Sequence, residues 1–113
     1  MATEVRKILG QVATLATTEA TLYTVTPGLK EMVSSSLIVC NRAGTASTFR
    51  VTVVEDGSGA TANEDYIYYD VTIAGADTFV AKLGLTLNGA DEVRVYASTA
   101  NLTFALFGLE ITP

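Results

Sequence analysis

The sequence predicts an all-β fold, a single-domain β-sandwich of the jelly-roll kind with about seven or eight antiparallel strands. Short apolar runs recur along the chain at roughly ten-residue spacing, as expected for a sandwich or barrel. Clusters of Gly, Pro, Asn and Asp separate these runs, and no amphipathic helical pattern competes with them. With 113 residues, the chain has the length of one domain.

Residues 1–19 form the most ambiguous part of the sequence. The apolar residues Val5, Ile8 and Leu9 stand among charges, and the Thr-rich continuation at residues 14–18 favours extended structure. One interpretation is an extended arm that lies on a neighbouring subunit, since ten extended residues reach up to about 36 Å. The other is an edge strand of the same domain. We assign residues 20–113 to the β-sandwich itself.

The middle of the chain contains five predicted strands separated by turn residues. Pro27-Gly28 and Asn88-Gly89 are strong turn signals, and Gly84 predicts a bulge or bend within the last of these strands. The predicted strands cover residues 20–26, 31–41, 48–55, 66–73 and 78–87.

The last predicted feature of the chain is a β-hairpin at residues 92–111. Its second strand is apolar on both faces: Leu102, Phe104 and Leu106 share one, and the other carries Ala105, Phe107, Leu109 and Ile111. A strand of this kind is usually covered on both sides. In so short a chain, we expect a second subunit to supply one cover. We also expect Gly108 to permit a bulge that turns Leu109 and Ile111 into a second layer.

The composition favours a subunit of an assembly over a lone monomer. Only 17% of the residues are charged, against about 25% in a typical soluble domain, and 49% are apolar. The net charge is −5 with no basic cluster, so nucleic-acid binding is not expected. Neither a signal peptide nor a membrane-spanning run of about 20 apolar residues is evident, so we expect synthesis in the cytoplasm and no membrane association.

The residue types for enzymatic or metal chemistry are mostly missing. The sequence has no histidine, which removes His-based metal sites and His-activated Ser or Cys nucleophiles. Glu55, Asp56, Glu64 and Asp65 bracket one loop, which we interpret as a solvated acidic loop; a calcium site is the weaker alternative because the spacing matches no calcium-loop pattern. Cys40, the only cysteine, is interpreted as a small buried hydrophobe. We therefore expect no catalytic residue, no cofactor and no metal.

Three tyrosines on one predicted strand allow two interpretations. Tyr66, Tyr68 and Tyr69 could form a platform that stacks on a sugar or contacts a partner. Packing within the core and across strands is favoured, because aromatic residues contribute to sheets in this way.

Several segments resemble small structural proteins of tailed bacteriophages. They are distributed along most of the chain after Leu22 and comprise residues 38–42, 66–70, 84–87, 93–98, 102–104 and 107–110. The resemblance implies a small β-domain that trimerises on the virion, either decorating the capsid or building the tail. It implies no catalytic residues.

These observations together predict a non-enzymatic capsid decoration (cement) protein, located in the virion and acting as a homotrimer. Its expected partners are copies of itself and the major capsid protein or other virion proteins. A tail, baseplate or fibre component is one alternative, and a small carbohydrate-binding module is another. The expected subunit interface contains Val5, Ile8, Leu9, Phe104, Phe107, Leu109 and Ile111.

Overall fold

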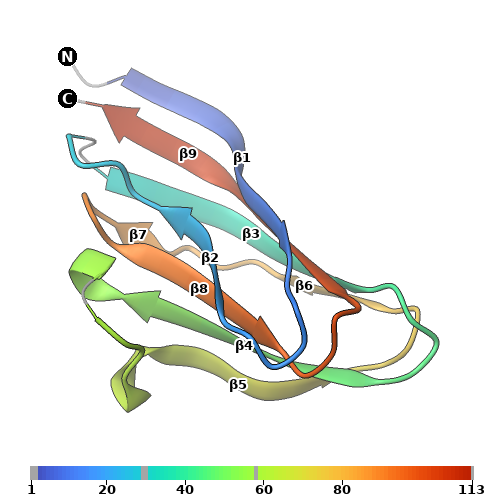
Figure 1. Cartoon of the computed structure of the whole chain (residues 1–113). Coiled ribbons are helices and arrows are strands. Elements are labelled where there is room, and N and C mark those ends of the chain that lie inside the picture. Colours follow the sequence, from blue (N-terminus) through green and yellow to red (C-terminus); the bar gives the residue numbers. More distant parts are fainter. Residues whose placement is uncertain (1–2, 29–30, 58, 113) are drawn as a thin grey trace.

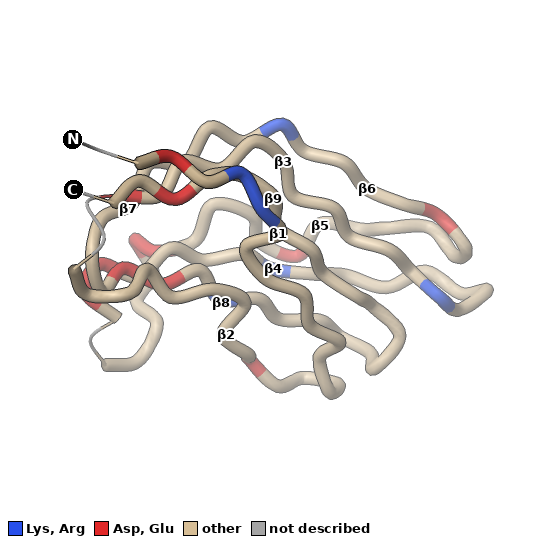
Figure 2. Tube along the Cα trace, turned by 90° about the horizontal axis from the view of Figure 1, so that it is seen from above, with Lys and Arg blue, Asp and Glu red and all other residues tan. Residues whose placement is uncertain are grey.

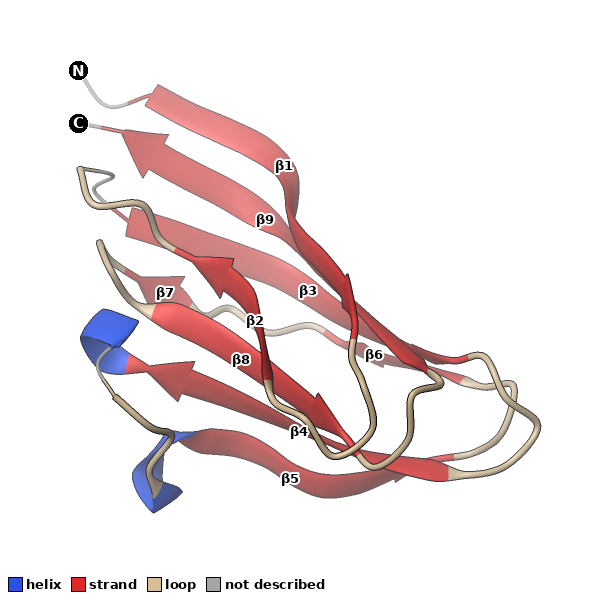
Figure 3. Cartoon of the chain, viewed as in Figure 1, coloured by secondary structure: helices blue, strands red, loops and turns tan. Residues whose placement is uncertain are grey.

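Nine β-strands make up most of the computed structural model, which describes residues 3–28, 31–57 and 59–112. Two short 3-10 turns, η1 (Glu55–Gly57) and η2 (Asn63–Asp65), lie in the connection between β4 and β5 (Figure 3). The strands are β1 (Thr3–Ala13), β2 (Ala20–Thr24), β3 (Glu31–Asn41), β4 (Ser47–Val54), β5 (Tyr66–Ile73), β6 (Thr78–Ala81), β7 (Thr86–Leu87), β8 (Glu92–Ala97) and β9 (Leu102–Thr112).

The strands form two antiparallel sheets that pack face to face (Figure 1). Sheet A has the order β1-β9-β3-β6, with β7 also paired to β3, and sheet B has the order β2-β8-β4-β5. The pairs are nested: β4 with β5, β3 with β6 and β7, β2 with β8, and β1 with β9. A long antiparallel ribbon folded over on itself in this way is a jelly roll, so the predicted fold class is confirmed.

The one strand expected at residues 78–87 is two short strands, β6 and β7, on either side of Gly84. The hydroxyl of Ser34 on β3 explains the interruption. It donates a hydrogen bond to the carbonyl of Leu83 and accepts one of 3.0 Å from the amide of Leu85. This side chain takes the place of regular ladder bonds while β6 ends and β7 begins.

Strand β1 is an edge strand of sheet A and pairs with β9 from Thr3 to Ala13. Residues 1 and 2 lie outside the described residues. A Cβ on Gly10 would sit 2.1 Å from the carbonyl oxygen of Leu22. Glycine at this point therefore lets β1 approach β2 and close the sandwich at this edge.

The core lies between the two sheets and is built around an aromatic cluster. The ring of Phe49 lies 5.2 Å from that of Phe79, 6.2 Å from that of Phe104 and 6.3 Å from that of Tyr68, measured between centroids. Edge-on and tilted contacts of this kind are the arrangements that aromatic rings prefer. Aliphatic side chains extend this core along both sheets, among them Met32, Leu37, Val39, Val51, Val93, Val95, Leu102 and Leu106.

Strand β9 keeps a regular alternation through Gly108, contrary to the expected bulge in this strand. The extra residues lie in its two neighbours: Leu9 on β1 and Ser35 on β3, where the pairing registers shift. A Cβ on Gly108 would meet the carbonyl oxygen of Val33 at 2.3 Å. The glycine thus accommodates the crowded backbone of β3, and Leu109 and Ile111 stay on the same face as Phe107.

A hydrogen bond between the sheets joins Tyr23 on β2 to Glu110 on β9. The hydroxyl of Tyr23 donates to one carboxylate oxygen, and Lys7 donates to the other at 3.2 Å. The bond from Tyr23 lowers the pKa of the Glu110 carboxyl below its usual 4.5 against the opposing effect of burial. Burial, followed by the bond to the carboxylate, raises the pKa of Tyr23.

Replacement of Gly108 by Ala is expected to lower the free energy of unfolding by about 1–3 kcal/mol, because the new methyl group collides with backbone atoms. Gly84→Ala is the matched control: its Cβ would meet no atom within 4 Å. Urea titrations of both variants measure the difference. Equal stabilities of the two variants would show that the space at Gly108 is not restricted.

Acid is expected to destabilise the wild-type protein partly through Glu110. Because the pKa of Glu110 is lower in the folded chain, its contribution is present above the unfolded value near 4.5 and is lost as the pH falls through the folded value. Tyr23→Phe removes the hydrogen bond and should weaken this acid dependence. Thermal melts of both proteins between pH 7 and 3 measure it, and unchanged acid dependence in the variant would contradict the assignment.

Candidate functional site

An apolar surface covers the outward side of sheet A, and we call it the outer face of sheet A. It spans the width of the sheet from β1 to β6. Ile8 and Val80 are 52% and 58% exposed, respectively, and the other members are half-buried. Its apolar residues are Ile8 on β1, Phe107, Ala105, Leu109 and Ile111 on β9, Val33, Ile38 and Cys40 on β3, and Val80 on β6.

Strand register places these side chains on one face. Residues directly opposite each other in antiparallel strands project to the same side of a sheet. Phe107 is opposite Ile8 on β1 and Ser36 on β3, while Ile38 is opposite Ala105 and Val80. The intervening residues, such as Leu37 and Leu106, point into the core instead.

Polar residues surround this apolar centre at the edges and ends of the strands. Glu4, Arg6 and Gln11 lie on the β1 side, while Glu31, Thr78 and Thr103 lie at the strand ends. An apolar centre with a polar rim is the usual anatomy of a protein–protein interface. An apolar patch of this kind on a soluble domain marks a contact site more often than a solvated surface.

Two hollows indent the outer face of sheet A. One of about 370 Å³ lies between β1, β9 and β3, lined by residues including Gln11, Ile38 and Ala105. The other, of about 300 Å³, lies beside Phe107 and Leu109. Hollows of this size on an apolar face can accept side chains of a protein partner.

The outward side of sheet B is polar, and its charges are paired within the chain. Arg94 is 11% exposed and donates a 2.9 Å hydrogen bond to Glu92, while its second contact, with Glu19, spans 3.8 Å. It also donates to the hydroxyl of Thr61 and the carbonyl oxygen of Gly57. These contacts hold the loop between β4 and β5 against the sheet, so the role of Arg94 is structural.

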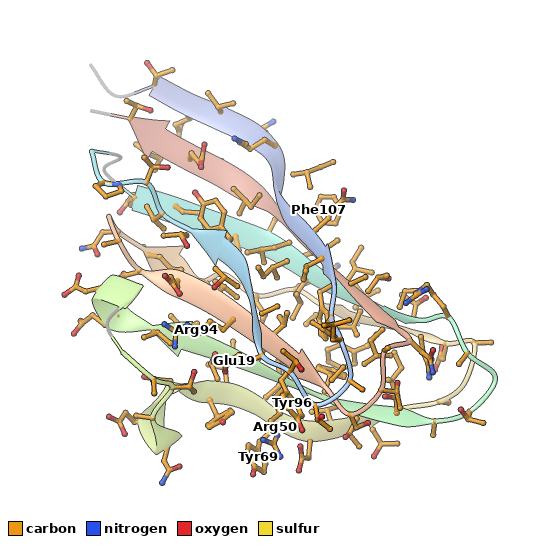
Figure 4. The ribbon with its side chains drawn as sticks, in the orientation of Figure 1. Glu19, Arg50, Tyr69, Arg94, Tyr96 and Phe107 are labelled. Carbon is orange, nitrogen blue, oxygen red and sulfur yellow. The ribbon has the colours of Figure 1, made fainter. Side chains whose placement is uncertain are left out.

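Arg50 lies between two tyrosine rings on the same side of sheet B (Figure 4). Its guanidinium carbon is 4.3 Å from the ring centroid of Tyr69 and 4.5 Å from that of Tyr96, both cation–π distances. It donates a 2.6 Å hydrogen bond to Asp70, which lowers the pKa of that carboxyl and raises that of Arg50. Figure 4 places Phe107 on the opposite side of the molecule from this stack.

Four of the seven residues expected at an interface meet on the outer face of sheet A: Ile8, Phe107, Leu109 and Ile111. Val5 is opposite Glu110 and therefore projects to the other side of sheet A, where it is 48% exposed. Leu9 and Phe104 are buried in the core of the subunit, at 8% and 1% exposure. Their side chains fill the sandwich and are not available to a partner, which corrects the expectation for these two positions.

The sequence reasoning missed three apolar members of this face: Val33, Ile38 and Val80. Their signal was present in the alternation of the strands, because Ile38 stands between the core residues Leu37 and Val39. Alternation alone does not reveal which of two apolar faces is the core. Cys40, expected to be buried, is half-buried on this outward face.

The three tyrosines of β5 do not form one platform. Tyr68 is turned into the core, where its ring contacts those of Phe49 and Phe79. Tyr66 and Tyr69 form an edge-on pair with centroids 4.9 Å apart, and Tyr69 is 59% exposed. Register shifts beside Val51 separate Tyr68 from the other two.

The described parts of the chain contain no group of three or more Cys, Asp and Glu side chains that could hold a metal ion. The acidic loop at residues 55–65 is held by hydrogen bonds, such as the 2.9 Å bond that the Asp56 amide donates to the carboxylate of Asp91; Ser58 lies outside the described residues. Among the residues that the structure describes, Figure 2 shows no gathering of lysine and arginine on one surface of the tube. No described helix is long and apolar enough to cross a bilayer.

The chain is similar to known proteins in its structure but not in its sequence. No protein-family model and no curated protein sequence matches the chain. The fold is similar to that of chains in the particle of infectious bursal disease virus, with a TM-score of 0.55, 9% identity and coverage of 98% of this chain. A chain from the Gx strain of that virus gives a TM-score of 0.55 at 7% identity.

The chain spans about a third of the length of those viral chains, 30% and 37% in the two cases. At such low identity the likeness establishes the fold alone, because one fold carries many functions. The chain is therefore a jelly-roll domain with the architecture of a domain found in viral particles.

Proposed function

We propose that this protein is a non-enzymatic structural component of a virion, and that it decorates an assembled capsid as a cement protein. The observation that carries the proposal is the outer face of sheet A, which is apolar at its centre and polar at its rim. The jelly-roll architecture shared with chains of a viral particle supports it.

The mechanism is stabilisation by selective binding. A protein that binds only the assembled shell favours that state by mass action, as any ligand stabilises the state it binds. The outer face of sheet A would pack on the shell or on sister subunits and bury Ile8, Phe107 and Val80. The outward side of sheet B, with Arg50 and Arg94 already paired, would remain in water.

The expected homotrimer is part of this proposal. Its support is the same apolar face, which extends across sheet A to β1 and so reaches the margin where sister subunits can meet. The sequence resemblance suggests a tailed bacteriophage as the source, whereas the similar solved structures come from infectious bursal disease virus. The structural likeness gives the bacteriophage assignment no support, and that assignment stays a prediction.

Two other functions fit the fold less specifically. A tail, baseplate or fibre component would use the same apolar face for assembly. A carbohydrate-binding module would use the tyrosines of β5, but Tyr68 belongs to the core and Tyr69 is stacked on Arg50. The structure therefore favours an assembly function.

Replacement of Phe107 by Asp is expected to leave the subunit folded and to weaken its self-association and its binding to particles by at least tenfold. The reason is that a carboxylate at the centre of an apolar contact would be desolvated without a partner. Ile67→Asp on sheet B, at a residue 41% exposed, is the matched control and should behave as wild type. Light scattering measures self-association, and sedimentation with particles measures binding.

A folded Phe107→Asp variant that associates and binds as the wild type does would remove the outer face of sheet A from the proposal. Loss of binding in the Ile67→Asp control alone would move the contact to sheet B.

Quantitative mass spectrometry of purified particles is expected to find hundreds of copies of the chain per particle. A decoration protein covers a repeating shell, whereas a tail part occupies one location. A count of a few to a few dozen copies would exclude the decoration function and favour the tail alternative.

A further inference from the structure

The outer margin of β1 is an open edge of sheet A. On one side β1 pairs with β9, and on its other side no described strand pairs with it. An edge strand of this kind presents unpaired N–H and C=O groups that can receive another strand. The side chains from Thr3 to Ile8 are all exposed, so nothing in the described chain covers this margin.

The length of the regular edge is limited by the bulge at Leu9. From Thr3 to Ile8 the pairing with β9 is continuous, and the register shifts between Ile8 and Gly10. A bulge twists a strand and interrupts further pairing. Strand addition is therefore confined to the segment before Leu9.

Symmetry restricts how two copies of this segment can pair. Two antiparallel strands related by a two-fold axis place each residue opposite one that projects to the same face. The axis must then pass beside one residue, which faces its own copy. The candidates for that central residue within the regular segment are Glu4, Val5, Arg6 and Lys7.

Charge selects one of these four registers. Centring on Glu4, Arg6 or Lys7 would place two identical charges directly opposite each other, which destabilises a strand pair. Centring on Val5 places two valines together and sets Glu4 opposite Arg6 of the second copy, twice by symmetry. Opposite charges in this position stabilise a strand pair. The same register pairs Thr3 with Lys7 and ends before the bulge.

We propose that β1 is a strand-addition site for β1 of a second copy of this chain, in the antiparallel register centred on Val5. The contact joins the two copies of sheet A into one continuous sheet across a two-fold axis. It also makes the two outer faces of sheet A continuous, since Ile8 of each copy lies close to the junction.

The contact between two copies of β1 does not depend on the virion function. A two-fold contact through β1 and a contact through the outer face of sheet A use different parts of the surface. In the proposed decoration of a shell, the two-fold contact would link neighbouring trimers. In a protein with any other function it would still form a dimer.

Cysteine cross-linking of the full chain tests the register. In a Cys40→Ser background, which removes the one free thiol, Val5→Cys places two cysteines opposite each other. Opposed residues have Cα atoms about 4.5–5.5 Å apart, within the range of a disulfide. Mild oxidation should convert most of this variant into a covalent dimer on a non-reducing gel. Lys7→Cys in the same background is the matched control, because its partner is Thr3, and should remain monomeric on the gel.

Charge reversal tests the selectivity of the same contact. Glu4→Arg or Arg6→Glu alone should raise the dissociation constant of the β1 pair by about tenfold, because two attractive pairs become repulsive. The double variant Glu4→Arg/Arg6→Glu restores opposite charges and should recover cross-linking through Val5→Cys. Circular dichroism checks that these exposed substitutions leave the subunit folded.

A Val5→Cys protein that cross-links no better than the Lys7→Cys control would overturn the proposal. So would a double charge variant that loses as much association as the two single variants together. Both readouts use the isolated protein, so a failure here is distinct from a failure to bind particles. Efficient cross-linking of Val5→Cys without particle binding would keep the strand pairing and reject the virion function.

Discussion

The pleat of β9 is the constraint on which the rest of the structure depends. This strand lies between β1 and β3, and alternate side chains point to opposite sides of sheet A. Leu102, Phe104 and Leu106 fill the sandwich, while Phe107, Leu109 and Ile111 point away from it. One strand thus supplies the core of the subunit and the centre of its apolar outer face. Gly108 preserves this alternation by leaving room for the backbone of β3.

The outward surfaces of the two sheets differ in whether their side chains already have partners within the subunit. On sheet B, Arg50 and Arg94 already contact carboxylates or tyrosine rings within the chain, so these charges do not require a partner protein. On sheet A, apolar side chains remain half-exposed around two hollows. Burial of this face would release water from apolar surface, which is the dominant favourable term in most protein associations. A virion, in which many subunits pack side by side, offers a setting for such burial.

The sequence was sufficient for the fold class and most strand positions, because alternation and turn residues are local signals. The interruption between β6 and β7 could not be predicted from local patterns, because the Ser34 hydroxyl that causes it forms hydrogen bonds with residues about fifty positions away. Bulges caused further differences: the register shifts around Val51 turn Tyr68 inward, and the bulge in β1 buries Leu9. For the outer face, the sequence identified Phe107, Leu109 and Ile111 but could not tell that Phe104 lies on the core side.

The most direct test of the assembly claim is hydroxyl-radical footprinting of the free protein and of purified particles that contain it. Side chains on the outer face of sheet A, with Phe107 and Leu109 as reporters, should be labelled in the free protein at a concentration where it is monomeric, and protected in the particle. Tyr69 on sheet B should be labelled equally in both. Protection of Tyr69 with unchanged labelling of Phe107 would contradict the account and place the contact on the opposite side of the sandwich.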